Sequence, residues 1–102
     1  MSFDLYLDNR HEQIAAHEEG IFYLIADERR NFPEINALWD NFYRSPKISA
    51  EQAHDLVHEL IELSEIISQS EEHRYLTSVI YRLLPFFNAA HRSGQSIRCV
   101  SD

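Results

Sequence analysis

Residues 49–67 read SAEQAHDLVHELIELSEII, and this segment carries the clearest helical pattern in the chain. Ser49 and Gln52 form a capping box, in which the two side chains accept hydrogen bonds from N–H groups that the start of a helix leaves free. After the box, apolar residues recur every three or four positions, which is the spacing of one buried helix face. The predicted core face consists of Ala53, Leu56, Leu60, Leu63 and Ile67.

The same helix carries an acidic stripe away from this core face. At about 100° per residue, its carboxylates fall within roughly a third of the helix circumference. The stripe consists of Glu51, Asp55, Glu59, Glu62 and Glu65. No Lys or Arg lies between Lys47 and Arg74, while Glu71 and Glu72 add further acids. Like charges at i and i+4 destabilise a helix by about 0.2–0.5 kcal/mol a pair, and solubility alone does not require a single sign of charge.

The composition limits what the chain can bind. It has 102 residues, with 17 Asp and Glu against 9 Lys and Arg, which gives a net charge of −8. The length fits one domain, residues 1–102, and a hydrophobic content of 44% is too high for a disordered chain. A chain this acidic repels phosphate groups, so we expect no direct binding to nucleic acid or to an anionic membrane surface.

Two further helices are predicted before the acidic one. The first begins at Asp8 or Asn9, which are suitable N-caps, and the second begins at Pro33, which suits a first helical turn. The first has apolar residues at helical spacing at Ile14, Ala15, Ile21, Phe22 and Ile25. The apolar face of the second would contain Ile35, Leu38, Trp39, Phe42 and Tyr43.

A fourth helix is predicted from about Glu71 to Arg92. Pro85 lies inside it and removes the hydrogen bond to the Tyr81 carbonyl, so we expect it to kink or divide the helix. Gly94 suits the end of the helix, where a left-handed residue is common. The apolar face of this helix consists of Leu76, Val79, Ile80, Leu83, Phe87 and Ala90.

Short alternating segments occupy both ends of the chain. Phe3, Leu5 and Leu7 alternate with polar residues, and Ile97 and Cys99 alternate in the same way. Alternation is typical of half-buried strands, and if the two segments pair they would form a two-stranded ribbon packed against the helices. We therefore predict a mainly α, single-domain bundle of about four helices, with this terminal ribbon if the segments pair.

The sequence also favours a cytosolic location. Cys99 is the only cysteine, so a secreted scaffold that depends on intrachain disulfides is excluded. The first residues carry acids where a signal peptide needs bases. The longest apolar run, Ile21–Ala26, is far shorter than the roughly 20 residues that cross a bilayer.

Candidate catalytic chemistry is sparse. His54 and His58 lie one turn apart, a spacing that can place two imidazoles on one metal ion, although Asp55 stands where the HExxH zincins have Glu. Solvated surface histidines among acids explain the pair better than a metal site does, and no third ligand can be identified by spacing. Cys99, in an alternating segment, fits a small buried side chain better than a reactive thiol. We expect no catalytic residue, metal or cofactor.

The chain resembles small bacterial immunity proteins, which protect cells from contact-dependent growth inhibition and related secreted toxins. The resemblance rests on a small, acidic, helical-looking chain without catalytic motifs. It also rests on SAEQ (49–52) opening an acidic helix, on LLPFFNAA (83–90) and on the closing GQSIRCVSD (94–102). It implies a cytosolic inhibitor that binds a cognate toxin domain, often a nuclease, and blocks its active site. Such families share no universal functional residues, so the resemblance assigns no site.

The leading hypothesis is therefore an inhibitor that binds a basic toxin domain, of nuclease type, through its acidic helix. The expected partner-binding residues are Glu51, Asp55, His58, Glu59, Glu62 and Glu65. Two alternatives remain open, and the oligomeric state is left open with them. One is a helical adaptor or homo-oligomeric interaction protein, whose acidic face only keeps it soluble. The other is a metal-dependent hydrolase that uses His54 and His58.

Overall fold

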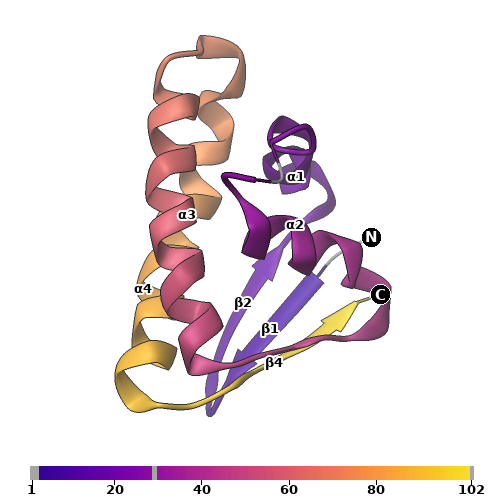
Figure 1. The fold of residues 1–102 in the computed structure, drawn as a ribbon, viewed down its shortest axis with the longest axis vertical. Helices are drawn as coiled ribbons and strands as arrows, with labels where there is room; N and C mark the ends of the chain where they lie inside the picture. The colour runs from indigo at the N-terminus through magenta and orange to yellow at the C-terminus, as the bar shows by residue number, and fades with distance from the viewer. Residues whose placement is uncertain (1–2, 29, 102) are drawn as a thin grey trace.

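The computed structural model describes residues 3–28 and 30–101, and it leaves the side chain of Phe42 outside the description. The described chain is a mixed α/β domain in which helices pack against a four-stranded antiparallel sheet (Figure 1). The prediction of a mainly α bundle is therefore wrong. Its error lies in the first quarter of the chain, where a hairpin forms in place of a helix.

The sheet has the strand order β2-β1-β4-β3. Its strands are β1 (Phe3–Leu7), β2 (Arg10–Ile14), β3 (Lys47–Ile48) and β4 (Ile97–Ser101). The two terminal segments, whose pairing the sequence left open, do pair, because β1 runs antiparallel to β4 with Tyr6 opposite Arg98. This pair is not an isolated ribbon, however, but the centre of the sheet, with β2 and β3 at its edges.

The predicted helix from Asp8 or Asn9 is wrong. Asp8 and Asn9 form the loop of the β1–β2 hairpin, in which Leu7 pairs with Arg10, and Asp8 adopts a positive φ of 55°. Asp and Asn tolerate that conformation and so suit a turn as well as a helix cap. Of the apolar residues assigned to that helix, Ile14 is buried in β2, Ile21 and Phe22 are buried in the short helix α1 (Gly20–Leu24), and Ile25 is buried just after it. Ala15 is only partly buried, and a 3₁₀ turn η1 (Ala16–Glu18) separates β2 from α1.

The later helices follow the sequence pattern more closely. They are α2 (Pro33–Asp40), η2 (Phe42–Arg44), α3 (Ala50–Ser68), η3 (Glu71–Leu76) and α4 (Thr77–Ser93). Pro33 starts α2, the Ser49–Gln52 capping box opens α3, and Gly94 ends α4 in the left-handed conformation, all as predicted. Ile35 and Leu38 of the predicted α2 face are buried, but Tyr43 is exposed because α2 ends before it. The prediction for the Phe42 side chain lies outside the described residues.

Pro85 does not divide the last helix. The helix α4 runs through it as one element, so the predicted split is wrong. Pro85 and Tyr81 are both exposed, so the carbonyl of Tyr81 that loses its helical donor lies on the solvent side, where water can satisfy it. The apolar face of α4 is buried on both sides of the proline.

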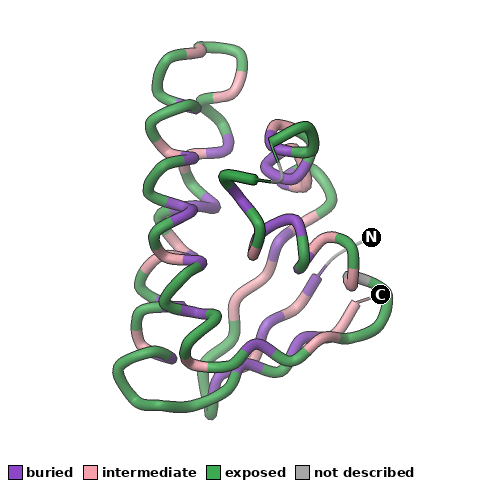
Figure 2. Tube along the Cα trace, in the orientation of Figure 1, coloured by how far each residue is buried: buried purple, intermediate pink, exposed green. Residues whose placement is uncertain are grey.

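The α3–α4 hairpin packs against the sheet and extends beyond it (Figure 1). The helices α1 and α2 lie beside this hairpin. Figure 2 shows the buried residues on the inner sides of these elements, where they form one core. All residues of the predicted α3 and α4 core faces are buried. On the sheet, Phe3, Leu5 and Leu7 point into this core, while Tyr6 and Arg98 lie on the other face.

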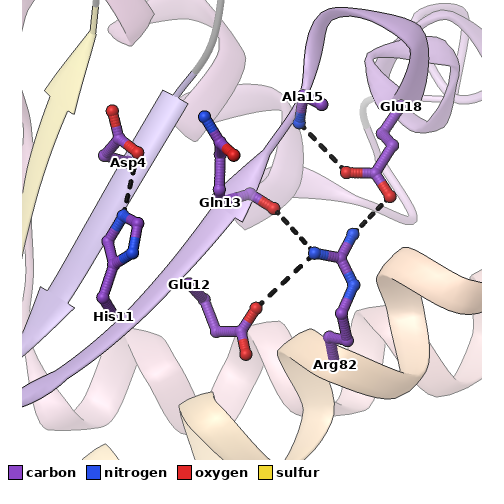
Figure 3. A network of polar contacts seen from close by, with 7 residues as sticks. All are labelled: Asp4, His11, Glu12, Gln13, Ala15, Glu18 and Arg82. Carbon is purple, nitrogen blue, oxygen red and sulfur yellow. Dashed lines mark hydrogen bonds and ion pairs between the residues drawn. The ribbon is translucent and has the colours of Figure 1, made fainter.

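Arg82 joins the helical layer to the sheet (Figure 3). Its guanidinium extends from α4, forms an ion pair with Glu18 and donates a hydrogen bond of 3.3 Å to the Gln13 carbonyl of β2. Glu12 lies farther away, at 3.7 Å. Because β2 is an edge strand, Arg82 also covers a carbonyl that another strand could otherwise pair with.

Candidate partner-binding surface

Most of the predicted partner-binding residues are solvent exposed on α3. Glu51, Asp55, His58, Glu62 and Glu65 are all exposed, as a surface for a partner requires. Glu59 differs from them, because only 7% of it is accessible.

Glu59 caps a different helix. One of its carboxylate oxygens accepts the N–H of Ile35 at 2.9 Å and the other accepts the N–H of Glu34 at 3.0 Å. These are N–H groups in the first turn of α2, which the Phe32 side chain at the N-cap position cannot satisfy. A carboxylate at this end of a helix also interacts favourably with the helix dipole. Glu59 thus supplies from α3 the cap that the local sequence of α2 lacks.

Burial raises the pKa of the Glu59 carboxyl above its usual range. The hydrogen bonds from Ile35 and Glu34 oppose that shift, and the negative charges of Glu34 and Asp55 add to it. The helix geometry contains a signal for this burial. At about 100° per residue, Glu59 lies only about 40° from Leu63 of the core face, at the margin of the stripe.

Two adjoining hollows lie along the exposed side of α3 and share Asn31. One is lined by Arg30, Glu34, Asp55, His58 and Glu59, and the other by Glu28, Phe32, Glu62, Glu65 and Ile66, among others. We call the two together the acidic groove. Their volumes of about 360 and 300 Å³ leave room for protruding side chains of a partner. Glu51 lines neither hollow.

The second wall of the acidic groove was missed by the sequence analysis. Glu28 and Arg30 line it from the segment that leads into α2, and Glu34 lines it from the first turn of α2. Asn36 anchors this segment, because its buried side-chain amide donates hydrogen bonds to the carbonyls of Ile25 and Phe32 at 3.2 and 2.9 Å. The linear sequence holds no periodic signal that links these acids to α3, since the contact depends on the packing of α2.

The candidate catalytic residues are placed as follows. His54 and His58 are exposed and in ring contact, and His91 of α4 lies against His54. Within residues 3–28 and 30–101, no three His, Cys, Asp or Glu side chains are arranged around a metal position. Cys99 is buried, as predicted, and burial raises the pKa of its thiol to about 12. A thiol with that pKa forms almost no thiolate at neutral pH and is a poor nucleophile.

Comparison of the chain with protein-family models, curated proteins and solved structures gives no match. Among the described residues, none of the helices has both the length and the apolar character needed to cross a membrane.

Proposed function

We propose that this chain is a cytosolic immunity protein of the contact-dependent growth inhibition type, which binds and neutralises a basic toxin domain. The toxin is of nuclease type, and the acidic groove with the adjoining face of α3 is the binding surface. The observation that carries this proposal is the charge of the groove. Its carboxylates come from α3 and from residues 28–34, Arg30 is the one Lys or Arg among the described residues of its lining, and the stripe on α3 continues the same charge.

The groove carboxylates match the chemistry of a nuclease active site. Such a site carries Lys and Arg side chains that hold nucleic-acid phosphates. The carboxylates Glu28, Glu34, Asp55, Glu62 and Glu65 can occupy the positions of those phosphates. Complementary charge also speeds the encounter of two proteins and excludes partners of the wrong sign. Binding in this way blocks the toxin without any catalytic step in the inhibitor.

The groove also offers apolar area. Ile66 lines it and is 39% exposed, and Ile61 on the same helix is 45% exposed. Stable interfaces combine an apolar centre with a polar rim. The exposed side chains of Ile66 and Ile61 provide apolar surface for such a centre, and the surrounding carboxylates provide the rim. A toxin surface that pairs Lys and Arg with an apolar side chain over Ile66 would use both features.

The test is neutralisation of a toxin by charge-reversed variants. The product of the adjacent open reading frame is expressed with the wild-type chain or with Asp55→Lys/Glu62→Lys/Glu65→Lys, and cell growth and co-purification are measured. We expect the wild type to restore growth, and the variant to lose protection and to lower affinity at least 100-fold. The matched control is Asp27→Lys/Glu71→Lys/Glu72→Lys, which changes the net charge equally at exposed residues outside both hollows.

The outcomes separate a surface effect from a net-charge effect. Equal loss in both triple variants would show that total charge matters and the groove does not. Unchanged protection by the groove variant would remove α3 from the interface. A harmless neighbouring product would contradict the immunity role itself. In the binding assay, a rise in salt should slow association, because it screens exposed charges.

A further inference from the structure

A third hollow lies between α2, β3 and α3, where it adjoins the acidic groove through the shared residue Glu34. Its lining includes core side chains that are almost fully buried, namely Leu38 at 7%, Ile48 at 4% and Leu56 at 2% exposure. The hollow lies at the N-terminal end of α3, and the acidic groove continues from there towards the C-terminal end of the same helix. We call this third depression the apolar hollow.

The charge of the apolar hollow is balanced, unlike that of the acidic groove. Among the described residues that line it, Lys47 is the one base and Glu34 the one acid. Lys47 would repel a basic side chain that entered the hollow, and Glu34 would repel an acidic one. The apolar residues of the lining favour apolar atoms, because each Å² of apolar surface removed from water contributes about 25 cal/mol. The side chain that suits this hollow is therefore uncharged and apolar.

The polar side chains of the lining already form hydrogen bonds within the chain. The Asn41 amide donates to the Ala37 carbonyl at 2.8 Å, and the Gln52 side chain accepts the Ser49 N–H at 2.9 Å. These bonds belong to the end of α2 and to the capping box of α3. A polar group that entered the hollow would compete with them, whereas an apolar group leaves them intact.

We propose that the apolar hollow receives one apolar side chain of the basic toxin domain, of the size of Leu or Phe. This inference rests on the proposed function, because it places the apolar side chain beside the Lys and Arg side chains that enter the acidic groove. The volume of the hollow is about 130 Å³, and an apolar cavity of about 150 Å³ in another protein holds benzene. Binding energy at protein interfaces is concentrated in side chains that fill such pockets, while polar contacts around them exclude water.

The apolar hollow also fixes the direction in which the toxin lies on α3. Negative charge attracts any basic surface, so it speeds association more than it selects one partner. Because the hollow lies at one end of the acidic groove, the cognate toxin must present its apolar side chain near β3 and its bases towards the C-terminal end of α3. A basic protein without that apolar side chain would leave the hollow unfilled and dissociate faster.

The test fills the hollow from its rim and measures binding of the product of the adjacent open reading frame. Ala37 is an exposed residue of α2 that lines the hollow, so Ala37→Phe occupies it without changing a core residue. We expect dissociation to become about tenfold faster, while the association rate and its salt dependence stay as in the wild type. The matched control is Ala16→Phe, at an exposed alanine of η1 that lines none of the three hollows, and it should bind as the wild type does. Circular dichroism checks that both variants fold.

A second variant, Lys47→Ala, tests the chemical class of the side chain that enters. Lys47 is exposed and lines the hollow, so it would pair with an acidic side chain of the toxin. For the proposed apolar side chain, we expect Lys47→Ala to change the dissociation rate less than about threefold. A loss as large as that in Ala37→Phe would overturn the apolar occupant.

The outcomes separate this inference from the proposed function. Unchanged dissociation of Ala37→Phe, from a toxin that the charge-reversed groove variant no longer binds, would overturn the inference and leave the proposed function standing. A neighbouring product that does not bind the wild type contradicts the proposed function, so the hollow is also tested in the free chain, by titration with toluene, the analogue of the Phe side chain. We expect toluene to shift the NMR signals of the Leu38, Ile48 and Leu56 amides in the wild type but not in Ala37→Phe. The absence of these shifts in the wild type would overturn the apolar hollow as a binding site.

Discussion

Two buried glutamates hold parts of this molecule together by different means. Glu18 is 6% exposed and Glu59 is 7% exposed, so both carboxylates are almost removed from water. Glu18 accepts the Ala15 N–H at 3.0 Å and forms an ion pair with Arg82 (Figure 3). Glu59 accepts two N–H groups of α2, and among the described residues no cation pairs with it.

The difference shows that the partner of a buried charge determines what that charge can do. The Glu18 charge is neutralised by Arg82 within the chain, so the contact of Arg82 with Glu18 and β2 stabilises the fold and leaves no charge for a partner to neutralise. Among the described residues, the Glu59 charge is met by the N–H groups and dipole of a helix end, which offset part of its desolvation. Among residues 3–28 and 30–101 it therefore has no counter-ion where it lines the acidic groove, and a basic partner of the kind proposed would add one.

The largest expected effect on stability comes from removing Arg82, the cation that pairs with Glu18. Arg82→Met should lower the free energy of unfolding by about 2 to 3 kcal/mol, because Glu18 would keep a buried charge without a counter-ion. The expected loss is at the low end for a buried pair, since the Arg82 side chain is itself 39% exposed. Urea unfolding at pH 7 measures the change.

The control for this prediction is Glu12→Gln. Glu12 lies 3.7 Å from the same guanidinium and is more exposed than Glu18, so its loss should cost less than about 0.5 kcal/mol. Adding Glu18→Gln to Arg82→Met should restore part of the stability, because the unpaired charge is then removed. A loss below about 1 kcal/mol in Arg82→Met would mean that the Ala15 N–H and solvent are enough to hold Glu18.

A smaller loss in the free energy of unfolding is expected from Glu59→Ala. The variant leaves the N–H groups of Glu34 and Ile35 without acceptors, and loss of a helix cap costs about 1 to 2 kcal/mol. Glu62→Ala, one turn farther along α3 and exposed, should change the stability by less than about 0.5 kcal/mol. Hydrogen exchange of the first turn of α2 should accelerate in Glu59→Ala alone. Equal losses in the two variants would contradict a capping role for Glu59.

This contrast also explains how far the sequence could predict the structure. The helix α3 was predicted correctly because its cap, Ser49 with Gln52, and its core face are encoded within one segment. The strand β2 was not, because only Ile14 of Arg10–Ile14 is buried and the segment becomes a strand by pairing with β1.

The candidate site divides in the same way. The exposed stripe on α3 follows from helix periodicity, so it could be predicted from residue spacing. The position of Glu59 near the core face follows from the same periodicity, but its capping of α2 could not be predicted, because the N–H of Ile35 reaches it from 24 residues away in the chain. The acids Glu28 and Glu34 of the opposite groove wall were missed for the same reason.

The smallest expected effect is on the pH dependence of stability, measured as the difference between the wild type and Glu59→Gln. Burial raises the pKa of Glu59 in the native state above the value of 4.5 expected in the unfolded chain. The native state therefore binds this proton more tightly than the unfolded state does. The stability that the protonated carboxyl contributes is fully present below pH 4.5 and is lost as the pH rises through the raised native pKa.

Relative to Glu59→Gln, the wild type should thus lose stability across that pH window, and urea unfolding at intervals from pH 4 to pH 7 measures the difference. Titration of the other carboxylates largely cancels, because both proteins contain them. The effect is smaller than loss of the cap, since the N–H groups of Ile35 and Glu34 favour the charged form and oppose the burial. An increase in relative stability with pH would mean that these two hydrogen bonds outweigh desolvation. The α2 helix end would then compensate the Glu59 charge as fully as Arg82 compensates Glu18, and only the other carboxylates of the groove would remain for a partner to neutralise.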